Sequence, residues 1–176
     1  MWCFVSFDYP HCLLLPMSNV HDQNINYMLC NFSPKAASAA EVVSASDVTF
    51  SCVSDPSALK EVVFGNCGAL QGIAEGKGYV DMSTVDVETC LEVAEAVTSR
   101  GGRFLEAPLC GSKQAAKRGC LTVLASGDKS LYDDCQSCFN AISKKAFYFG
   151  TKSHLLEIHS FRKRCLTNYL SMVGLM

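Results

Sequence analysis

Short runs of β-branched and aromatic residues, each followed by a polar turn and a helix-forming stretch, recur through the middle of the chain. The first run is residues 48–53 (VTFSCV), after which Ser54, Asp55 and Pro56 are typical of a helix start. Brief apolar runs of this kind are common in strands buried on both faces of a parallel sheet. The alternation therefore predicts an α/β fold with right-handed crossovers.

The remaining elements follow from the same pattern. Strands are expected over residues 79–82, 103–107, 121–125 and 146–149. Helices are expected over residues 36–43, 56–63, 87–100 and 129–141. We expect Ser33 and Asp128 to cap the first and last of these helices, and Ser83 with Asp86 to form a capping box before the third. The third helix should bury one apolar face: Val87, Leu91, Ala94 and Val97. The stretches 65–78 and 108–120 are predicted to be loops.

The two ends of the chain differ from its middle. Residues 1–32 show no clear periodicity, although residues 2–7 could form a short strand. Residues 151–176 lose the strand–helix alternation and include a basic cluster, Arg162–Arg164, with His154 and His159 nearby. We therefore divide the chain into an atypical segment (1–32), a Rossmann-like region (33–150) and a divergent tail (151–176).

Composition excludes some classes of protein. The formal net charge of −2 gives no overall field that would attract nucleic acid or an anionic membrane. The 11 cysteines are odd in number and scattered, so we expect reduced thiols rather than a disulfide framework. The first basic residue is Lys35, and no early apolar run is long enough for a signal peptide or a membrane span. An intracellular, soluble protein is expected, with no membrane partner.

Four segments carry a resemblance to a known family: SDVTFSCVSDP (46–56), GYVDMSTVD (78–86), RGGRFLEAPLCGS (100–112) and GDKSLYDDCQSCF (127–139). In order and separation they resemble the β-hydroxyacid dehydrogenase family, also called 3-hydroxyisobutyrate dehydrogenase-like. Within it, the chain is most similar to the glyoxylate reductase-like domains of nuclear, chromatin-associated proteins. The resemblance implies a doubly wound, mostly parallel sheet, NAD or NADP as cofactor and a small hydroxy or aldehyde acid as substrate.

The resemblance also implies site residues. The cofactor would lie against Val53, Ser54, Asp55, Ser83 and Thr84. Judged without the family, the four polar residues of this set are better explained as helix caps. The substrate carboxylate would lie at Cys110, Gly111 and Ser112, where the family usually has Pro-Val-Ser-Gly. Because a thiol is a weaker hydrogen-bond donor than a hydroxyl, Cys110 should impair this recognition.

Two family features are missing from the sequence. The first is the G-x-G-x-x-G fingerprint, a loop whose glycines let the backbone approach the pyrophosphate of the cofactor. The first glycine of this chain is Gly65, so no such fingerprint precedes residue 48. The family's catalytic Lys and Asn positions correspond to Glu157 and Phe161, with Lys152 out of register. We assign no catalytic residue. The fold is therefore predicted as a partial Rossmann-like sheet that lacks its first βαβ unit, and residues 48–53 would be an exposed edge unless residues 2–7 or 13–17 cover it.

Three functions stay open. The chain is an NAD(P)-binding dehydrogenase-like domain with impaired catalysis, a non-catalytic module for homo-oligomerisation and nucleosome or chromatin association, or a truncated product without independent function. A nuclear location follows from the second and a cytoplasmic one is the alternative. Cys135-x-x-Cys138 lies inside a predicted helix without a second pair, so no metal site is expected.

Overall fold

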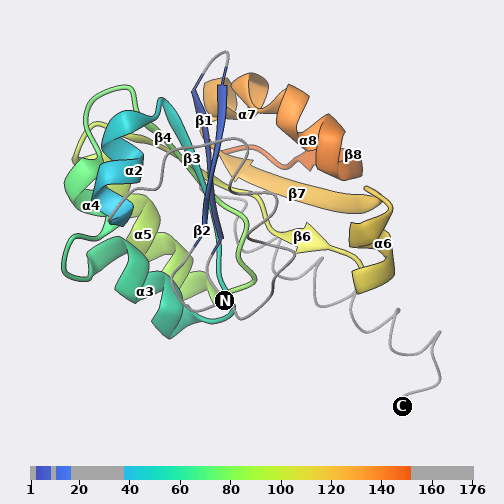
Figure 1. The fold of residues 1–176 in the computed structure, drawn as a ribbon, viewed down its shortest axis with the longest axis horizontal. Helices are drawn as coiled ribbons and strands as arrows, with labels where there is room; N and C mark the ends of the chain where they lie inside the picture. Colours follow the sequence, from blue (N-terminus) through green and yellow to red (C-terminus); the bar gives the residue numbers. More distant parts are fainter. Residues whose placement is uncertain (1–2, 9–10, 17–37, 152–176) are drawn as a thin grey trace. The chain divides into compact units, whose positions relative to one another are not determined.

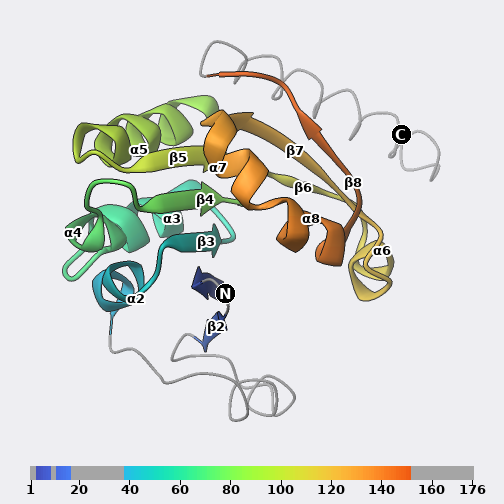
Figure 2. The same ribbon diagram turned by 90° about the horizontal axis from the view of Figure 1, so that it is seen from above.

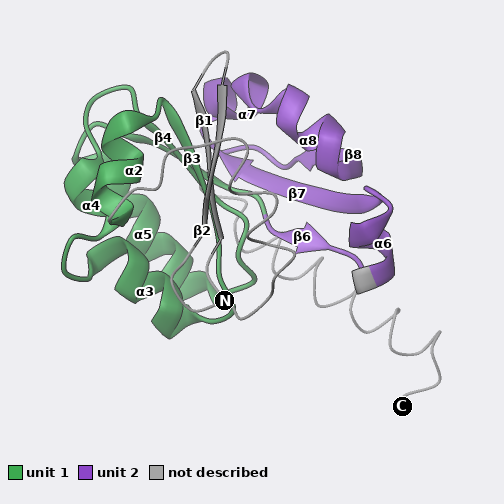
Figure 3. Ribbon diagram, in the orientation of Figure 1, with its two compact units in different colours: residues 1–107 green, residues 108–176 purple. Residues whose placement is uncertain are grey.

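A computed structural model describes residues 3–8, 11–16 and 38–151 of the chain (Figure 1). The chain divides into two compact units, residues 1–107 and residues 108–176, coloured separately in Figure 3. The boundary falls between Ala107 and Pro108, directly after the strand expected over residues 103–107.

The first unit is built on a five-stranded sheet. Its strands are β1 (Cys3–Asp8), β2 (His11–Pro16), β3 (Val48–Cys52), β4 (Gly78–Asp81) and β5 (Arg103–Glu106). Their order in the sheet is β2-β1-β3-β4-β5. Strands β3, β4 and β5 are parallel, whereas β1 is antiparallel to both of its neighbours. The three predicted strands of this unit are confirmed as β3, β4 and β5.

The first unit has four helices among its described residues: α2 (Ala39–Ala45), α3 (Pro56–Phe64), α4 (Ala69–Gly72) and α5 (Val87–Ser99). The sequence predicts three of them, α2, α3 and α5. Helix α3 begins as expected, with Asp55 as its cap and Pro56 as its first residue. The helices bury apolar residues, and the strands contribute further buried apolar residues. The core of this unit includes Val43, Leu59, Val63, Val80, Val93 and Leu105.

The strand β1 covers the edge that the sequence leaves exposed. It pairs along the whole of β3, with Val5 opposite Phe50 in the register. The expectation that residues near 2–7 protect this edge is confirmed. In the family's order, the neighbour of β3 would be a parallel strand followed by the glycine-rich loop. Here that position holds an antiparallel strand.

Helix α2 begins at Ala39 and is capped by Ser38, whose hydroxyl accepts from the N–H of Glu41; the predicted cap, Ser33, lies outside the described residues. Three other local predictions in this unit are wrong. Asp86 alone caps α5, so the capping box with Ser83 does not form. Leu91, expected in the apolar face of α5, is 43% exposed, because α5 turns Cys90 and Val93 inward instead. The stretch predicted as a loop over 65–78 contains the one-turn helix α4.

The second unit has a parallel pair of strands with helices between them. Strand β7 (Leu121–Gly127) pairs in parallel with β8 (Ser143–Tyr148) and antiparallel with the short β6 (Leu109–Cys110). Helix α6 (Lys113–Lys117) follows β6, so the polar stretch after Pro108 is not all loop as predicted. The single helix expected over 129–141 is instead two, α7 (Lys129–Asp134) and α8 (Gln136–Ile142), with the predicted cap Asp128 in place.

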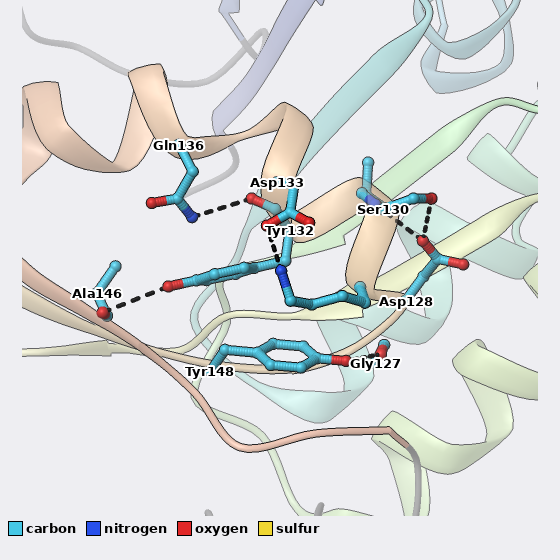
Figure 4. A network of polar contacts seen from close by, with 10 residues as sticks. Gly127, Asp128, Ser130, Tyr132, Asp133, Gln136, Ala146 and Tyr148 are labelled. Carbon is cyan, nitrogen blue, oxygen red and sulfur yellow. Dashed lines mark hydrogen bonds and ion pairs between the residues drawn. The ribbon is translucent and has the colours of Figure 1, made fainter.

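Two tyrosines join α7 to β8 (Figure 4). The rings of Tyr132 and Tyr148 have centroids 4.9 Å apart, and the ammonium of Lys129 lies 5.4 and 5.5 Å from these two centroids. The Tyr148 hydroxyl donates a 2.8 Å hydrogen bond to the carbonyl of Gly127, and Lys129 forms an ion pair with Asp133. Because the aromatic faces attract the cation, this arrangement holds the helix on the strand.

Candidate functional site

The candidate cofactor-binding edge lies in the first unit, where β3 and β4 end. Each strand is followed by a short loop and a helix: residues 53–55 lead into α3, and residues 82–86 lead into α5. In open α/β sheets, ligands bind beyond the carboxyl ends of the parallel strands, where such loops meet. The five predicted cofactor-contacting residues all lie in these two loops.

The structure brings two of these residues together. The backbone N–H of Val53 donates a 3.0 Å hydrogen bond to the hydroxyl of Ser83, and both residues are buried. The N–H of Ser83 in turn donates to Oδ1 of Asp81 at 3.1 Å. The polar groups of Val53 and Ser83 are therefore engaged inside the protein and join the two loops.

The other predicted residues of this edge are exposed. Asp55 accepts the N–H of Ala58 at 2.9 Å through Oδ1 and the hydroxyl of Ser54 at 2.8 Å through Oδ2. These two hydrogen bonds, chiefly the one from Ala58, lower the pKa of the Asp55 carboxyl below its usual value, so it is ionised at neutral pH. Thr84 is exposed in the loop before α5. An exposed carboxylate with a nearby hydroxyl suits a ligand that donates hydrogen bonds, such as a ribose.

The same edge does not fit a pyrophosphate. Helices α3 and α5 point their first N–H groups at their own caps, Asp55 and Asp86, and these carboxylates add negative charge where phosphate would need donors. Beside β3, where the family places its glycine-rich loop, runs the antiparallel strand β1. This edge therefore offers hydrogen-bond acceptors that would suit a ribose and negative charge that does not suit a phosphate.

The predicted substrate residues belong to the second unit. Cys110 ends β6 and is half-buried. Gly111 has φ +152°, and a Cβ at this position would lie 2.7 Å from Cδ2 of Leu121, so the backbone here requires glycine. Ser112 caps α6, with its hydroxyl accepting the N–H of Ala115 at 3.2 Å. The hydroxyl of Ser112 therefore has a structural role in the fold.

Two carboxyl groups at this edge were missed in reading the sequence. Asp81 is the last residue of β4 and Glu106 the last of β5, and their side chains are 0% and 1% exposed. The signal was present in the letters YVDM and RFLE, because each places an acidic residue inside a run predicted to be a buried strand. Acidic side chains are rarely buried without a reason.

The remaining candidates add no site. Cys135 is buried where α7 meets α8 and Cys138 is half-buried on α8. In the part of the chain that the structure describes, no three His, Cys, Asp or Glu side chains are grouped to hold a metal ion. Lys152, Glu157, Phe161 and the basic cluster at 162–164 lie outside the described residues. No helix within the described ranges has the length and apolar character to cross a bilayer.

Comparison with known sequences gives a family match and close relatives. The family model described as the NAD binding domain of 6-phosphogluconate dehydrogenase matches residues 15–150. The cytokine-like nuclear factor N-PAC of Mus musculus is 58% identical over 111 residues, which are 63% of this chain and 20% of that protein. The chain thus spans about a fifth of the length of this relative.

Comparison with solved structures confirms the fold. The 3-hydroxyisobutyrate dehydrogenase of Mycobacterium tuberculosis matches with a TM-score of 0.62 and 21% identity, over 69% of this chain and 41% of that one. An imine reductase of Myxococcus stipitatus in complex with NAD+ matches with a TM-score of 0.73 and 12% identity, over 91% of this chain and 53% of that one. The same enzyme has been solved with NADP+. The predicted α/β, Rossmann-like, mostly parallel architecture is therefore correct.

Proposed function

The chain belongs to the family of the NAD-binding domain of 6-phosphogluconate dehydrogenase, and we propose that it is a hydroxyacid dehydrogenase-like domain with an incomplete cofactor site. In this proposal it binds NAD or NADP weakly and does not by itself turn over a small hydroxy or aldehyde acid. The observation that carries the proposal is the antiparallel β1, which occupies the place beside β3 where the family has its glycine-rich loop.

The residues present fit part of the cofactor only. Asp55 and Thr84 are exposed at the ends of β3 and β4 and would accept hydrogen bonds from a ribose. When bound, a nicotinamide cofactor of this kind supplies hydride transfer. The Cys110 thiol is a weaker donor than the family's serine hydroxyl, and the Ser112 hydroxyl already caps α6. Recognition of a substrate carboxylate would then depend on backbone N–H groups at Gly111 and Ser112.

Calorimetric titration with NADPH and NADH tests the proposal directly. We expect dissociation constants in the millimolar range or weaker, because the phosphates would face two carboxylates at the described edge, Asp55 and Asp86. A micromolar constant, or turnover of a hydroxy acid with either cofactor, would overturn it. The variant Asp55→Asn keeps a good helix cap but removes the charge, so tighter binding by this variant would show that the carboxylate repels phosphate.

A second function is favoured by the high identity to N-PAC over the strand–helix region. We propose, as an alternative, a non-catalytic module that works in the nucleus through self-association and binding to nucleosomes. Leu91 on α5 is 43% exposed and Phe64 at the end of α3 is 38% exposed, so this unit carries apolar side chains that an interface would use.

Light scattering and a nucleosome pull-down separate the two functions. The association module predicts a dimer or larger species and retention on nucleosomes, both reduced in Leu91→Lys. The exposed variant Glu95→Lys, on the same helix, is the matched control and should change neither result. A monomer that is not retained on nucleosomes argues for the first function alone.

A further inference from the structure

A row of polar side chains crosses the three parallel strands of the first unit at their carboxyl ends. In the register, Ser51 of β3 is opposite Asp81 of β4, and Asp81 is opposite Glu106 of β5. Figure 2 shows these strands side by side. Residues at matching positions of neighbouring strands lie on the same face, so the three side chains adjoin one another. Asp81 and Glu106 therefore place two carboxyl groups next to each other, away from water.

Asp81 is the first member of a chain of hydrogen bonds that reaches both loops of the ligand edge. Its Oδ1 accepts the N–H of Ser83, whose hydroxyl accepts the N–H of Val53. Among the described residues, its other oxygen, Oδ2, has no hydrogen-bond partner. A buried carboxylate with one oxygen unsatisfied is costly, whereas the protonated acid is much less so. The surroundings of Asp81 thus favour its neutral form.

Among the described residues, no positively charged side chain is seen to act on Asp81. Burial raises the pKa of the Cys90 thiol on α5 and of the Tyr79 hydroxyl on β4, so both groups are neutral at physiological pH. Asp86 at the start of α5 is negative, because hydrogen bonds from Thr89 lower its pKa. The side of β3 that faces the pair carries hydroxyl groups, and the buried residues of α3 are apolar. Among the residues of the first unit whose burial the structure describes, no Lys, Arg or His is buried.

We propose that Asp81 and Glu106 form a proton-binding carboxyl pair, which takes up one proton in mildly acidic solution and in which Asp81 positions the loops after β3 and β4. The pair does not depend on nucleotide binding, so it can be tested separately from the proposed function.

The direction of the pH effect follows from the pKa of Asp81. Burial raises this pKa from 3.8 to about 6; the charge of Glu106 adds to the rise, and the hydrogen bonds from Ser83 oppose it. Because the folded state holds the proton more tightly than the unfolded state, the stabilisation from neutral Asp81 is complete below about pH 4. It is lost as the pH rises through about 6.

Denaturant unfolding across pH tests the pair. Each unit of pKa shift changes an equilibrium constant tenfold. Between pH 4 and 7, the unfolding equilibrium constant of the unmodified protein, divided by that of Asp81→Asn, should therefore rise about a hundredfold. Glu106→Gln removes the neighbouring charge and should move this change to lower pH. The exposed Asp47→Asn is the control and should keep the profile of the unmodified protein. Parallel profiles for Asp81→Asn and the unmodified protein would overturn the proposal.

Two further measurements cover variants that fail to fold. The carboxyl carbon shift of Asp81, followed by NMR in the unmodified protein, should titrate near pH 6; a midpoint at or below the usual value for aspartate would refute the pair. For loop positioning, Asp81→Ala should speed hydrogen exchange at the N–H groups of Ser83 and Val53. Asp81→Asn, whose amide oxygen still accepts, should restore slow exchange, and equal exchange in both variants would refute the positioning role.

Discussion

The backbone N–H of Val53 and the hydroxyl of Ser83, thirty residues apart in the chain, are joined by a buried hydrogen bond of 3.0 Å. This bond ties the loop after β3 to the loop after β4, so the two loops that carry the candidate cofactor residues form one structural piece. It also removes Ser83 from the role of helix cap. The arrangement of the ligand edge therefore depends on a contact between strands and not on local helix signals.

Removing this hydroxyl should destabilise the first unit. We expect Ser83→Ala to lower the free energy of unfolding by about 1–3 kcal/mol, because it leaves the buried N–H of Val53 without an acceptor. Urea unfolding measures the change. The neighbouring Thr84 is exposed, so Thr84→Ala is the matched control and should change stability by less than about 0.5 kcal/mol. Equal effects of the two variants would show that the bond contributes nothing.

The cap of α5 gives a separate prediction. Asp86 accepts the N–H and the hydroxyl of Thr89, both at 2.9 Å. Asp86→Ala should therefore cost about 1 kcal/mol and increase hydrogen exchange in the first turn of α5. Glu88→Ala, an exposed change in the same turn, should cost only a few tenths of a kcal/mol. If Ser83→Ala loosened this turn more than Asp86→Ala does, Ser83 would be the true cap.

The starts of helices α3 and α5 show how far the sequence predicts the site. The start of α3 is predictable, because Asp55 and Pro56 are local signals that nothing distant contradicts. The start of α5 is not, because Ser83 and Asp86 are both good caps and the choice between them is made by Val53. A long-range hydrogen bond leaves no periodicity in the sequence.

The sheet shows the same limit. Strands β3, β4 and β5 follow from their composition, and so does the need for a strand beside β3. The direction of β1 does not follow, because the same apolar residues can pair in either direction. Asp81 and Glu106 lie inside two of the predicted strands, but only the register of the strands places them side by side.

Gly111 provides a test of the second unit. Its φ is +152°, and a Cβ added by Gly111→Ala would lie 2.7 Å from Cδ2 of Leu121, so this variant should strain the backbone and displace the end of the Leu121 side chain. We expect a loss of about 1–3 kcal/mol, mainly from the backbone strain. Gly119 has φ +62° but no close contact, so Gly119→Ala should cost about 1–2 kcal/mol. Thermal unfolding compares the two; a smaller loss at Gly111 would mean that its φ does not constrain the fold.

The direction of β1 can be checked by a chemical cross-link. The antiparallel register places Cys3 directly opposite Cys52. Residues opposite one another in an antiparallel pair have Cα atoms roughly 4.5–5.5 Å apart, within the range that a disulfide spans. Mild oxidation with diamide should therefore join Cys3 to Cys52, as detected by peptide mapping under non-reducing conditions. Cys3→Ser should abolish the cross-linked peptide, whereas Cys12→Ser, in β2, should leave it.

A parallel β1, like the first strand of the family, would instead bring Cys3 to the start of β3 near Val48, and no Cys3–Cys52 peptide would form. In that case the place beside β3 would be open to a cofactor loop, and the proposal of an incomplete cofactor site would lose its main support.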